Sequence, residues 1–199
     1  IEEERKKSDH LLLNILPEET AVELKQNGKV QAKKFDSVSV LFTDFKEFTQ
    51  IADNLPPEKV VESVGYYFSK FDEIIEKHGL EKIKTIGDAY MCAGGLPYPS
   101  EDHALQTIQA GLEIVTFVEE CKHHLDSDLA KFEVRVGVNT GPVVAGVVGS
   151  KKFAYDIWGD TVNIAARMES NSEVGKVNIS ENTYTLIKEN FTCEFRGEI

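Results

Sequence analysis

The chain has 199 residues, of which 41% are hydrophobic and 28% are charged, and its formal net charge is -12. This composition is typical of one globular domain, and the acidic balance argues against a nucleic-acid binder, because such domains carry basic stripes that neutralise phosphates. The longest uncharged run, residues 136–150, is too short and too rich in glycine to span a bilayer, so we expect no membrane span. Cys92, Cys121 and Cys193 are widely spaced among apolar residues, which fits a reducing compartment and favours the cytoplasm.

The first 28 residues differ in pattern from the rest of the chain. A charged run over residues 2–7 is followed by apolar residues, by Pro17 and by a stretch that ends at Gly28, which predicts two short helices joined at the proline. Two interpretations remain open: an amphipathic lid on the core, or a linker that transmits a signal from an upstream regulatory or sensor domain. We therefore divide the chain into a helical transducing segment, residues 1–28, and a main domain, residues 29–199.

Apolar periodicity in the main domain predicts a mixture of strands and helices. In chain order the predicted elements are a strand over 35–44, a helix over 56–77, a hairpin of strands over 80–85 and 89–93, a helix from 101 to about Leu125, strands over 132–138 and 143–148 with a turn at Gly141 and Pro142, an aromatic excursion over 151–158, a helix over 159–168, a strand over 177–179, and a last helix and strand. This order predicts an α+β domain whose antiparallel sheet is covered by helices on one face.

Two carboxylates stand where predicted strands end. Asp44 closes the first strand and Asp88 lies in the hairpin turn, so both side chains are expected at a shared edge. Magnesium prefers oxygen ligands and often takes only one or two protein carboxylates. For either residue alone, capping a turn is the commoner role, and the surrounding sequence has to decide.

Asn163 and Arg167 are four residues apart in a predicted helix, so they share one face and can point into the same cleft. For Arg167, an ion pair with Glu169 or Glu173 is the competing interpretation.

Four stretches together carry a family resemblance. They are Phe-Thr-Asp-Phe-Lys-Glu-Phe-Thr over 42–49, Lys-Thr-Ile-Gly-Asp-Ala-Tyr-Met over 84–91, Gly-Val-Asn-Thr-Gly over 137–141, and the run from Tyr155 to Met168 that contains Trp-Gly-Asp-Thr-Val-Asn. In this order and spacing the chain resembles the class III adenylyl and guanylyl cyclase catalytic domain over roughly residues 30–196. The resemblance implies a ferredoxin-like βαββαβ core with a mostly antiparallel sheet. It also implies a homodimer with two interfacial active sites.

The resemblance also assigns roles to residues near the two acids. Asp44 and Asp88 match the family's metal ligands, with the Phe45 carbonyl as an additional oxygen, and two divalent ions, Mg²⁺ or Mn²⁺, are implied. The backbone amides of Phe48 and Thr49 are expected near the substrate phosphates.

Four further residues are assigned to the nucleotide. Asn163 is expected to orient the ribose and Arg167 to stabilise charge on the α-phosphate, both from the other subunit. Lys84 and Asp156 occupy the positions that read the base. A lysine donor and an aspartate acceptor complement adenine, whereas guanylyl members typically carry Glu and Cys there, so the predicted substrate is ATP.

Two alternatives to an adenylyl cyclase stay open: a guanylyl cyclase, and a non-catalytic cyclase-like module that only dimerises and signals. The module is disfavoured because all the expected polar side chains occur on one chain, namely Asp44, Lys84, Asp88, Asp156, Asn163 and Arg167. One departure from the family is Glu47, which stands in the phosphate-binding turn where many relatives have glycine.

Overall fold

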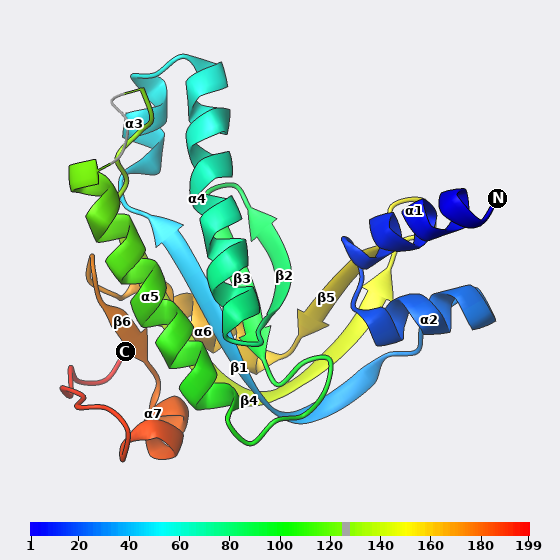
Figure 1. The fold of residues 1–199 in the computed structure, drawn as a ribbon. Coiled ribbons are helices and arrows are strands. Elements are labelled where there is room, and N and C mark those ends of the chain that lie inside the picture. Colours follow the sequence, from blue (N-terminus) through cyan, green and yellow to red (C-terminus); the bar gives the residue numbers. More distant parts are fainter. Residues whose placement is uncertain (125–127) are drawn as a thin grey trace.

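The structure is a computed structural model that describes residues 1–124 and 128–199. One sheet organises it, with strand order β2-β3-β1-β4-β5, and β6 is added beside β4 by parallel pairing (Figure 1). The strands are β1 (Lys33–Phe45), β2 (Glu81–Ile86), β3 (Ala89–Gly94), β4 (Val134–Val148), β5 (Ala154–Trp158) and β6 (Val177–Ile179). The helices are α1 (Glu2–Leu13), α2 (Glu18–Asn27), α3 (Phe48–Asp53), α4 (Pro57–Lys77), α5 (His103–His124), α6 (Asp160–Ser170) and α7 (Glu181–Ile187).

The centre of the sheet has the predicted ferredoxin-like order. Strand β1 leads through α3 and α4 to the β2–β3 hairpin, and α5 then leads to β4, which gives βαββαβ. Strands β3 and β4 both pair with β1 in antiparallel register, with Val40 opposite Ala93 on one side and opposite Asn139 on the other. The predicted α+β class and mostly antiparallel sheet are therefore confirmed.

One face of the sheet carries an aromatic core under α4 and α5. Side chains from β1 and the start of β4 meet those of both helices there, and Phe45 lies between Tyr67, at 5.3 Å, and Phe132, at 4.4 Å between ring centroids. Helix α4 begins at Pro57, whose fixed φ suits the first helical turn, and its apolar residues recur at helical spacing so that one stripe faces this core. In Figure 1 the two helices lie side by side in front of the sheet.

Helices lie on both faces, which differs in one detail from the prediction of helices on one face. Helix α6 packs Ala165 into a second apolar cluster, with Val40, Phe42 and Met91, on the side of the sheet away from α5. The approach is close because β4 presents glycines to α6: a Cβ at Gly137 would lie 1.9 Å from the backbone nitrogen of Glu169. Small residues in a strand permit such an approach of another backbone.

The predicted turn at Gly141 and Pro142 is wrong, because β4 runs unbroken from Val134 to Val148. Gly141 pairs with Val38 and Val143 pairs with Phe35, and the register of β1 shifts between these two pairs. This bulge opposite Pro142 leaves no ladder bond for the missing proline N–H to make. A glycine–proline pair therefore marks a bulge here and not a chain reversal.

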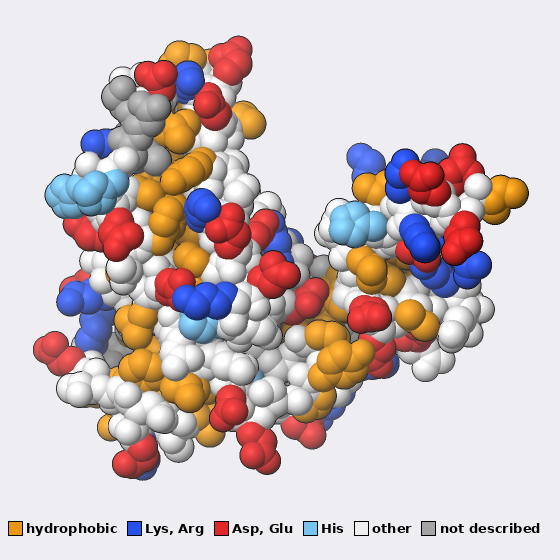
Figure 2. All heavy atoms as spheres, viewed as in Figure 1, with side chains coloured by type: hydrophobic (Ala, Val, Ile, Leu, Met, Phe, Trp, Pro, Cys, Tyr) orange, Lys and Arg blue, Asp and Glu red, His pale blue; other side chains and the backbone are white. Residues whose placement is uncertain are grey.

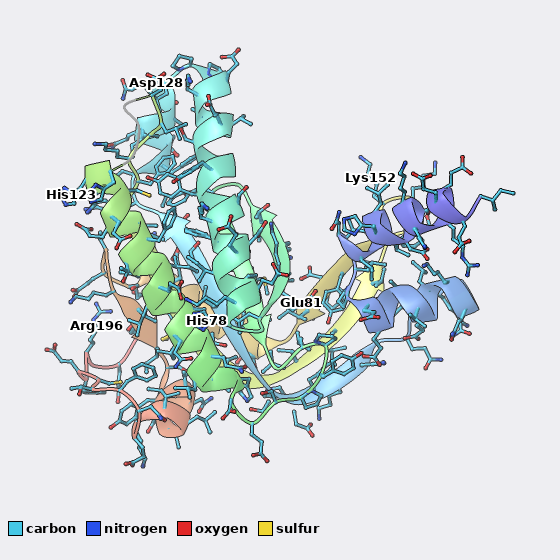
Figure 3. The ribbon with its side chains drawn as sticks, viewed as in Figure 1. His78, Glu81, His123, Asp128, Lys152 and Arg196 are labelled. Atoms are coloured by element: carbon cyan, nitrogen blue, oxygen red, sulfur yellow. The ribbon has the colours of Figure 1, made fainter. Side chains whose placement is uncertain are left out.

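The C-terminal part has one helix and no strand after β6 in the described residues, so the predicted last strand is also wrong. Residues 188–199 follow α7 without regular structure. Arg196, labelled in Figure 3, donates from Nη1 to the Asn171 carbonyl at 2.9 Å and holds this tail beside the end of α6. The predicted end of the long helix at Leu125 lies outside the described residues, and α5 is described as far as His124.

The N-terminal segment forms two helices joined at Pro17, as predicted. Helix α1 has no buried residue, whereas Leu16 and Ala21 join the second apolar cluster. Figure 2 shows these helices as a lobe separated by a notch from the body that contains α4 and α5. No helix in the described part of the chain is long and apolar enough to cross a membrane.

Candidate active site

Asp44 and Asp88 lie together at the end of the β1–β3 pair. Asp44 is the penultimate residue of β1, and Asp88 lies in the turn between β2 and β3. The Phe45 backbone N–H donates to Asp88 Oδ2 at 3.3 Å, which fixes the turn against β1. Burial, together with the adjacent Asp44 carboxylate, raises the pKa of Asp88 to about 6. The Asp44 carboxylate is thus held close enough to disfavour the charged form of Asp88.

Arg135 and Glu169 complete this charged cluster. Arg135 Nη2 donates to Asp44 Oδ2 at 3.0 Å and lies 3.8 Å from Glu169 Oε1. Glu169, near the end of α6, is almost fully buried, and burial followed by the charge of Asp44 raises its pKa to about 7, against the opposing effect of Arg135. One guanidinium therefore contacts two of the three acidic side chains in this cluster, which contains more acidic than basic groups.

The donor set of this cluster fits a hard divalent cation. Its ligand atoms are carboxylate and carbonyl oxygens, which Mg²⁺ and Mn²⁺ prefer. Residues 1–124 and 128–199 contain no group of three or more His, Cys, Asp or Glu side chains arranged to hold a metal. Two carboxylates are enough for Mg²⁺ where substrate phosphates and water supply the remaining ligands.

Lys84 and Asp156 form a second, separate pair. Strand β2 carries Lys84 and β5 carries Asp156, 72 residues later, and Lys84 Nζ donates to Asp156 Oδ2 at 2.6 Å. Asp156 Oδ1 also accepts from the Ile157 backbone N–H at 2.8 Å, which orients the carboxylate. The structure thus brings together the two residues to which the family resemblance assigned recognition of the base. Both side chains keep some exposure, 41% for Lys84 and 15% for Asp156, so the pair is open to a ligand.

Asn163 and Arg167 both lie exposed on α6, one turn apart. Arg167 makes no ion pair in the described part of the chain: Glu169 lies beside Arg135, and Glu173 pairs with Arg196 at 3.3 Å. The competing interpretation of Arg167 as an ion-pair partner of these acids is therefore wrong. Within the described residues, neither Asn163 nor Arg167 makes a hydrogen bond or ion pair with Asp44, whose partner is Arg135, or with Asp88, whose Oδ2 accepts from Phe45.

The predicted phosphate-binding turn is the start of the short helix α3. Phe48 and Thr49 are its first two residues, where backbone N–H groups have no acceptor inside the helix. The Phe48 ring packs 5.7 Å from Phe132, so its side chain anchors the turn in the aromatic core. Glu47, just before the helix, has a left-handed backbone with φ of 55°, a conformation that favours glycine. This geometry explains why glycine suits the position.

Arg135 and Glu169 were missed by the sequence analysis. Arg135 lies in an apolar alternating run, where a single arginine looks like a solvent-facing position, and Glu169 looked like a surface partner of Arg167. A usable signal existed for Arg135, because its place at the start of the Val-Gly-Val-Asn strand puts it across from Asp44 if that strand pairs with β1. Glu169 had none, since its burial depends on how closely α6 approaches Gly137.

The chain belongs to the family whose model describes the adenylate and guanylate cyclase catalytic domain, which matches residues 30–199. An adenylate cyclase of Mycobacterium tuberculosis (strain ATCC 25618 / H37Rv) is 40% identical over 200 residues, which is 100% of this chain and 44% of that protein. The receptor-type guanylate cyclase gcy-5 of Caenorhabditis elegans is also 40% identical, over 98% of this chain and 18% of its own length. The chain spans less than half the length of these curated relatives.

Among solved structures, the adenylyl cyclase CyaB from P. aeruginosa superposes with a TM-score of 0.79 at 29% identity, over 85% of this chain and 88% of that one. The chain is therefore a class III cyclase catalytic domain, and both adenylyl and guanylyl cyclases are among its relatives.

Proposed function

We propose that this domain is an adenylyl cyclase that converts ATP into 3′,5′-cyclic AMP and pyrophosphate. The observation that carries the proposal is the contact between Lys84 Nζ and Asp156 Oδ2 at 2.6 Å. Adenine offers a ring-nitrogen acceptor beside an amino donor, so it can replace this contact with one bond to the ammonium and one to the carboxylate. Guanine presents the opposite polarity and would leave both groups unpaired, which is strongly disfavoured in a partly buried pocket.

The reaction needs one new bond and one broken bond. The ribose 3′-oxygen bonds to the α-phosphorus while the bond from that phosphorus to the bridging β-oxygen breaks, and the hydroxyl proton passes to solvent. Arg167 would donate to the α-phosphate as charge accumulates there, and Asn163 would hold the ribose in line. Removing such a donor typically slows the reaction by about 10²–10³-fold.

Asp44, Asp88 and the Phe45 carbonyl would hold two divalent cations, Mg²⁺ or Mn²⁺. Such cations, when bound, would lower the pKa of the ribose 3′-hydroxyl and neutralise charge on the leaving pyrophosphate. The amides of Phe48 and Thr49, at the start of α3, would donate to the phosphates. Arg135 donates from Nη2 to Asp44 Oδ2 and so restrains the orientation of that carboxylate.

The active species we propose is a homodimer with two equivalent sites. One chain carries both the carboxylate pair and the exposed pair Asn163 and Arg167, and no hydrogen bond or ion pair joins the two pairs within the described residues. An apolar surface on the arm of β4 and β5 supports an interface: Val144, Val148, Phe153 and Trp158 are 38–49% exposed. Head-to-tail association would complete each site with residues of the second chain.

Residues 1–28 are proposed as a transducing segment that connects residues 29–199 to a regulatory or sensor domain. Leu16 and Ala21 are buried against the catalytic part, and Leu12 near the end of α1 packs partly against the same cluster, whereas the start of α1 is exposed, so the segment has one anchored end. The compartment we propose is the cytoplasm, supported by three free cysteines.

The test is product formation from ATP or GTP with Mg²⁺ or Mn²⁺ by the wild-type chain, by Asp44→Ala, by Arg167→Ala, and by an equimolar mixture of the two variants. We expect cyclic AMP from the wild type, loss of about 10²-fold or more in each variant, and partial recovery in the mixture, since mixed dimers contain one intact site. Cyclic GMP as the main product would overturn the base assignment. No recovery in the mixture would overturn the shared site.

A guanylyl cyclase is the second candidate, favoured by the 40% identity to the receptor-type relative of C. elegans. The double variant Lys84→Glu, Asp156→Cys separates the two, because it reverses the donors and acceptors that face the base. If the parent chain reads adenine through this pair, the variant loses ATP turnover and gains GTP turnover.

A further inference from the structure

Asn139 forms a polar bridge beneath the helix that carries Asn163 and Arg167. It lies in β4 and is 1% exposed. Its Nδ2 donates to the Thr161 carbonyl in the first turn of α6 at 3.0 Å, and its Oδ1 accepts from Ser180 Oγ at 2.6 Å. A buried carboxamide is thus bonded on both its donor and its acceptor side, to two elements that follow it in the chain.

Helix α6 packs so closely on β4 that its position on the strand has little freedom to change. Gly137 and Gly141 flank Asn139 on the same face of β4. A Cβ at Gly137 would lie 1.9 Å from the Glu169 backbone nitrogen, and a Cβ at Gly141 would lie 2.6 Å from Thr161 Oγ1. Thr161 Oγ1 also donates to the Pro142 carbonyl at 2.7 Å. The helix therefore rests on the backbone of β4 at both ends, and Asn139 makes a directional bond between the two glycines.

The same bridge continues into the interior on the other side. Ser180 caps α7 by accepting from the Thr183 N–H, and Thr183 Oγ1 lies 2.9 Å from Thr140 Oγ1. Thr140 Oγ1 in turn lies 2.7 Å from Ser39 Oγ. Thr140 is the neighbour of Asn139 in β4 but points to the opposite face, so it belongs to the network without touching α6. This offers a matched control within one strand.

We infer that Asn139 is a positioning residue for the cyclase reaction, acting through α6 on Asn163 and Arg167. The expected kinetic effect rests on the proposed function, whereas the placement of α6 by Asn139 does not. Asn163 and Arg167 project from the face of α6 that is exposed, so their positions follow the backbone of the helix. A displacement of about 1 Å at a catalytic group can cost about a hundredfold in rate. Loss of the Asn139 bond leaves the first turn of α6 with the hydrogen bond from Thr161 Oγ1 to the Pro142 carbonyl and with apolar contacts, which fix the helix less completely.

Two substitutions test the bond to α6. Asn139→Asp keeps an acceptor for Ser180 and removes only the donor to Thr161, whereas Asn139→Leu has the same number of side-chain heavy atoms and removes both bonds without burying a charge. Thr140→Val is the control, because it removes buried hydroxyl contacts of the same network and leaves Asn139 intact.

The kinetic readout is the split between kcat and KM, measured on folded protein with the free energy of unfolding followed in parallel. We expect kcat to fall by about tenfold or more in both Asn139 variants, with KM for ATP within about threefold of wild type, because Lys84 and Asp156 are not on α6. Thr140→Val is expected to lose stability but to keep kcat within about twofold. Equal kcat in all variants, or an equal loss of kcat in Thr140→Val, would overturn the inference.

Hydrogen exchange of the α6 amides is the readout that does not depend on activity. Asn139→Leu is expected to speed exchange within residues 161–167 relative to Thr140→Val at matched overall stability. If the wild type makes no cyclic nucleotide, the proposed function fails while this measurement still decides whether Asn139 positions α6. Unchanged α6 exchange in Asn139→Leu would contradict the positioning role even in an active enzyme.

Discussion

The two faces of the sheet differ in the size and polarity of the side chains they present. Under α4 and α5, large rings such as Phe45, Tyr67 and Phe132 fill the space between helix and sheet. Under α6, β4 presents Gly137, Asn139 and Gly141, and helix and strand meet backbone to backbone. The first arrangement stabilises the domain through buried apolar area, and the second places polar groups accurately.

The location of the charged groups follows this difference. Asp44 and Asp88 lie with Arg135 and Glu169 at the end of the α6 face, and burial with mutual repulsion raises the pKa of two of the carboxyls. No such cluster could persist in the aromatic core, where an unpaired charge is far more costly. The aromatic face under α4 and α5 thus provides most of the stability, whereas the face under α6 accommodates charged groups that interact unfavourably. Three predictions test this separation, from the largest expected effect to the smallest.

Phe132→Ala should cause the largest loss of stability. The ring is 1% exposed and lies between Phe45, Phe48 and Tyr67, so its removal leaves a cavity that the surrounding rings cannot close. We expect the free energy of unfolding in urea to fall by about 3–5 kcal/mol. Val61→Ala on α4, where the side chain is 73% exposed, is the control and should change it by less than about 0.5 kcal/mol. A loss below about 1 kcal/mol in Phe132→Ala would show that the aromatic face is not the main source of stability.

The pH dependence of stability should report the charged face. Asp88 and Glu169 have folded-state pKa values of about 6 and about 7, above their ordinary values, so the folded chain holds these protons more tightly than the unfolded chain. Their contribution to stability is complete below the unfolded pKa, near pH 4, and is lost as the pH rises through 6 and 7. Glu169→Gln should therefore flatten the upper part of this decline.

The measurement is the difference in the free energy of unfolding between wild type and Glu169→Gln across this pH range without added metal. The difference cancels the titrating groups that do not interact with Glu169. If this difference in the free energy of unfolding is independent of pH, Glu169 has an ordinary pKa, and its charged form is not destabilised in the folded cluster.

Glu47→Gly should give the smallest effect, a gain of stability of up to about 1 kcal/mol. The φ of 55° at this exposed residue is costly for any side chain with a Cβ and natural for glycine. Glu47→Ala removes the charge but keeps the Cβ, so it should show no such gain. A larger gain in the alanine variant would assign the effect to charge and not to backbone conformation.

The sequence alone predicted much of the fold, because its strongest signals are local. Apolar periodicity located α4, α5, α6 and most strands, and Pro17 marked the joint between the first two helices correctly. Four motifs identified the family, and with it the ferredoxin-like order of the strands. Prediction failed at Gly141 and Pro142, where the same dipeptide serves a turn or a bulge depending on the register of the neighbouring strand.

Only the tertiary structure could decide which residues surround the motifs. Arg135 reaches Asp44 across 91 residues of sequence, and Glu169 is buried because two glycines let α6 lie directly on β4. Residue types in the motifs predicted the chemistry, since carboxylate, ammonium and guanidinium groups have fixed preferences for cations, bases and phosphates. Distances, burial and the pKa values that follow from them depend on packing between segments far apart in the chain, which no local pattern encodes.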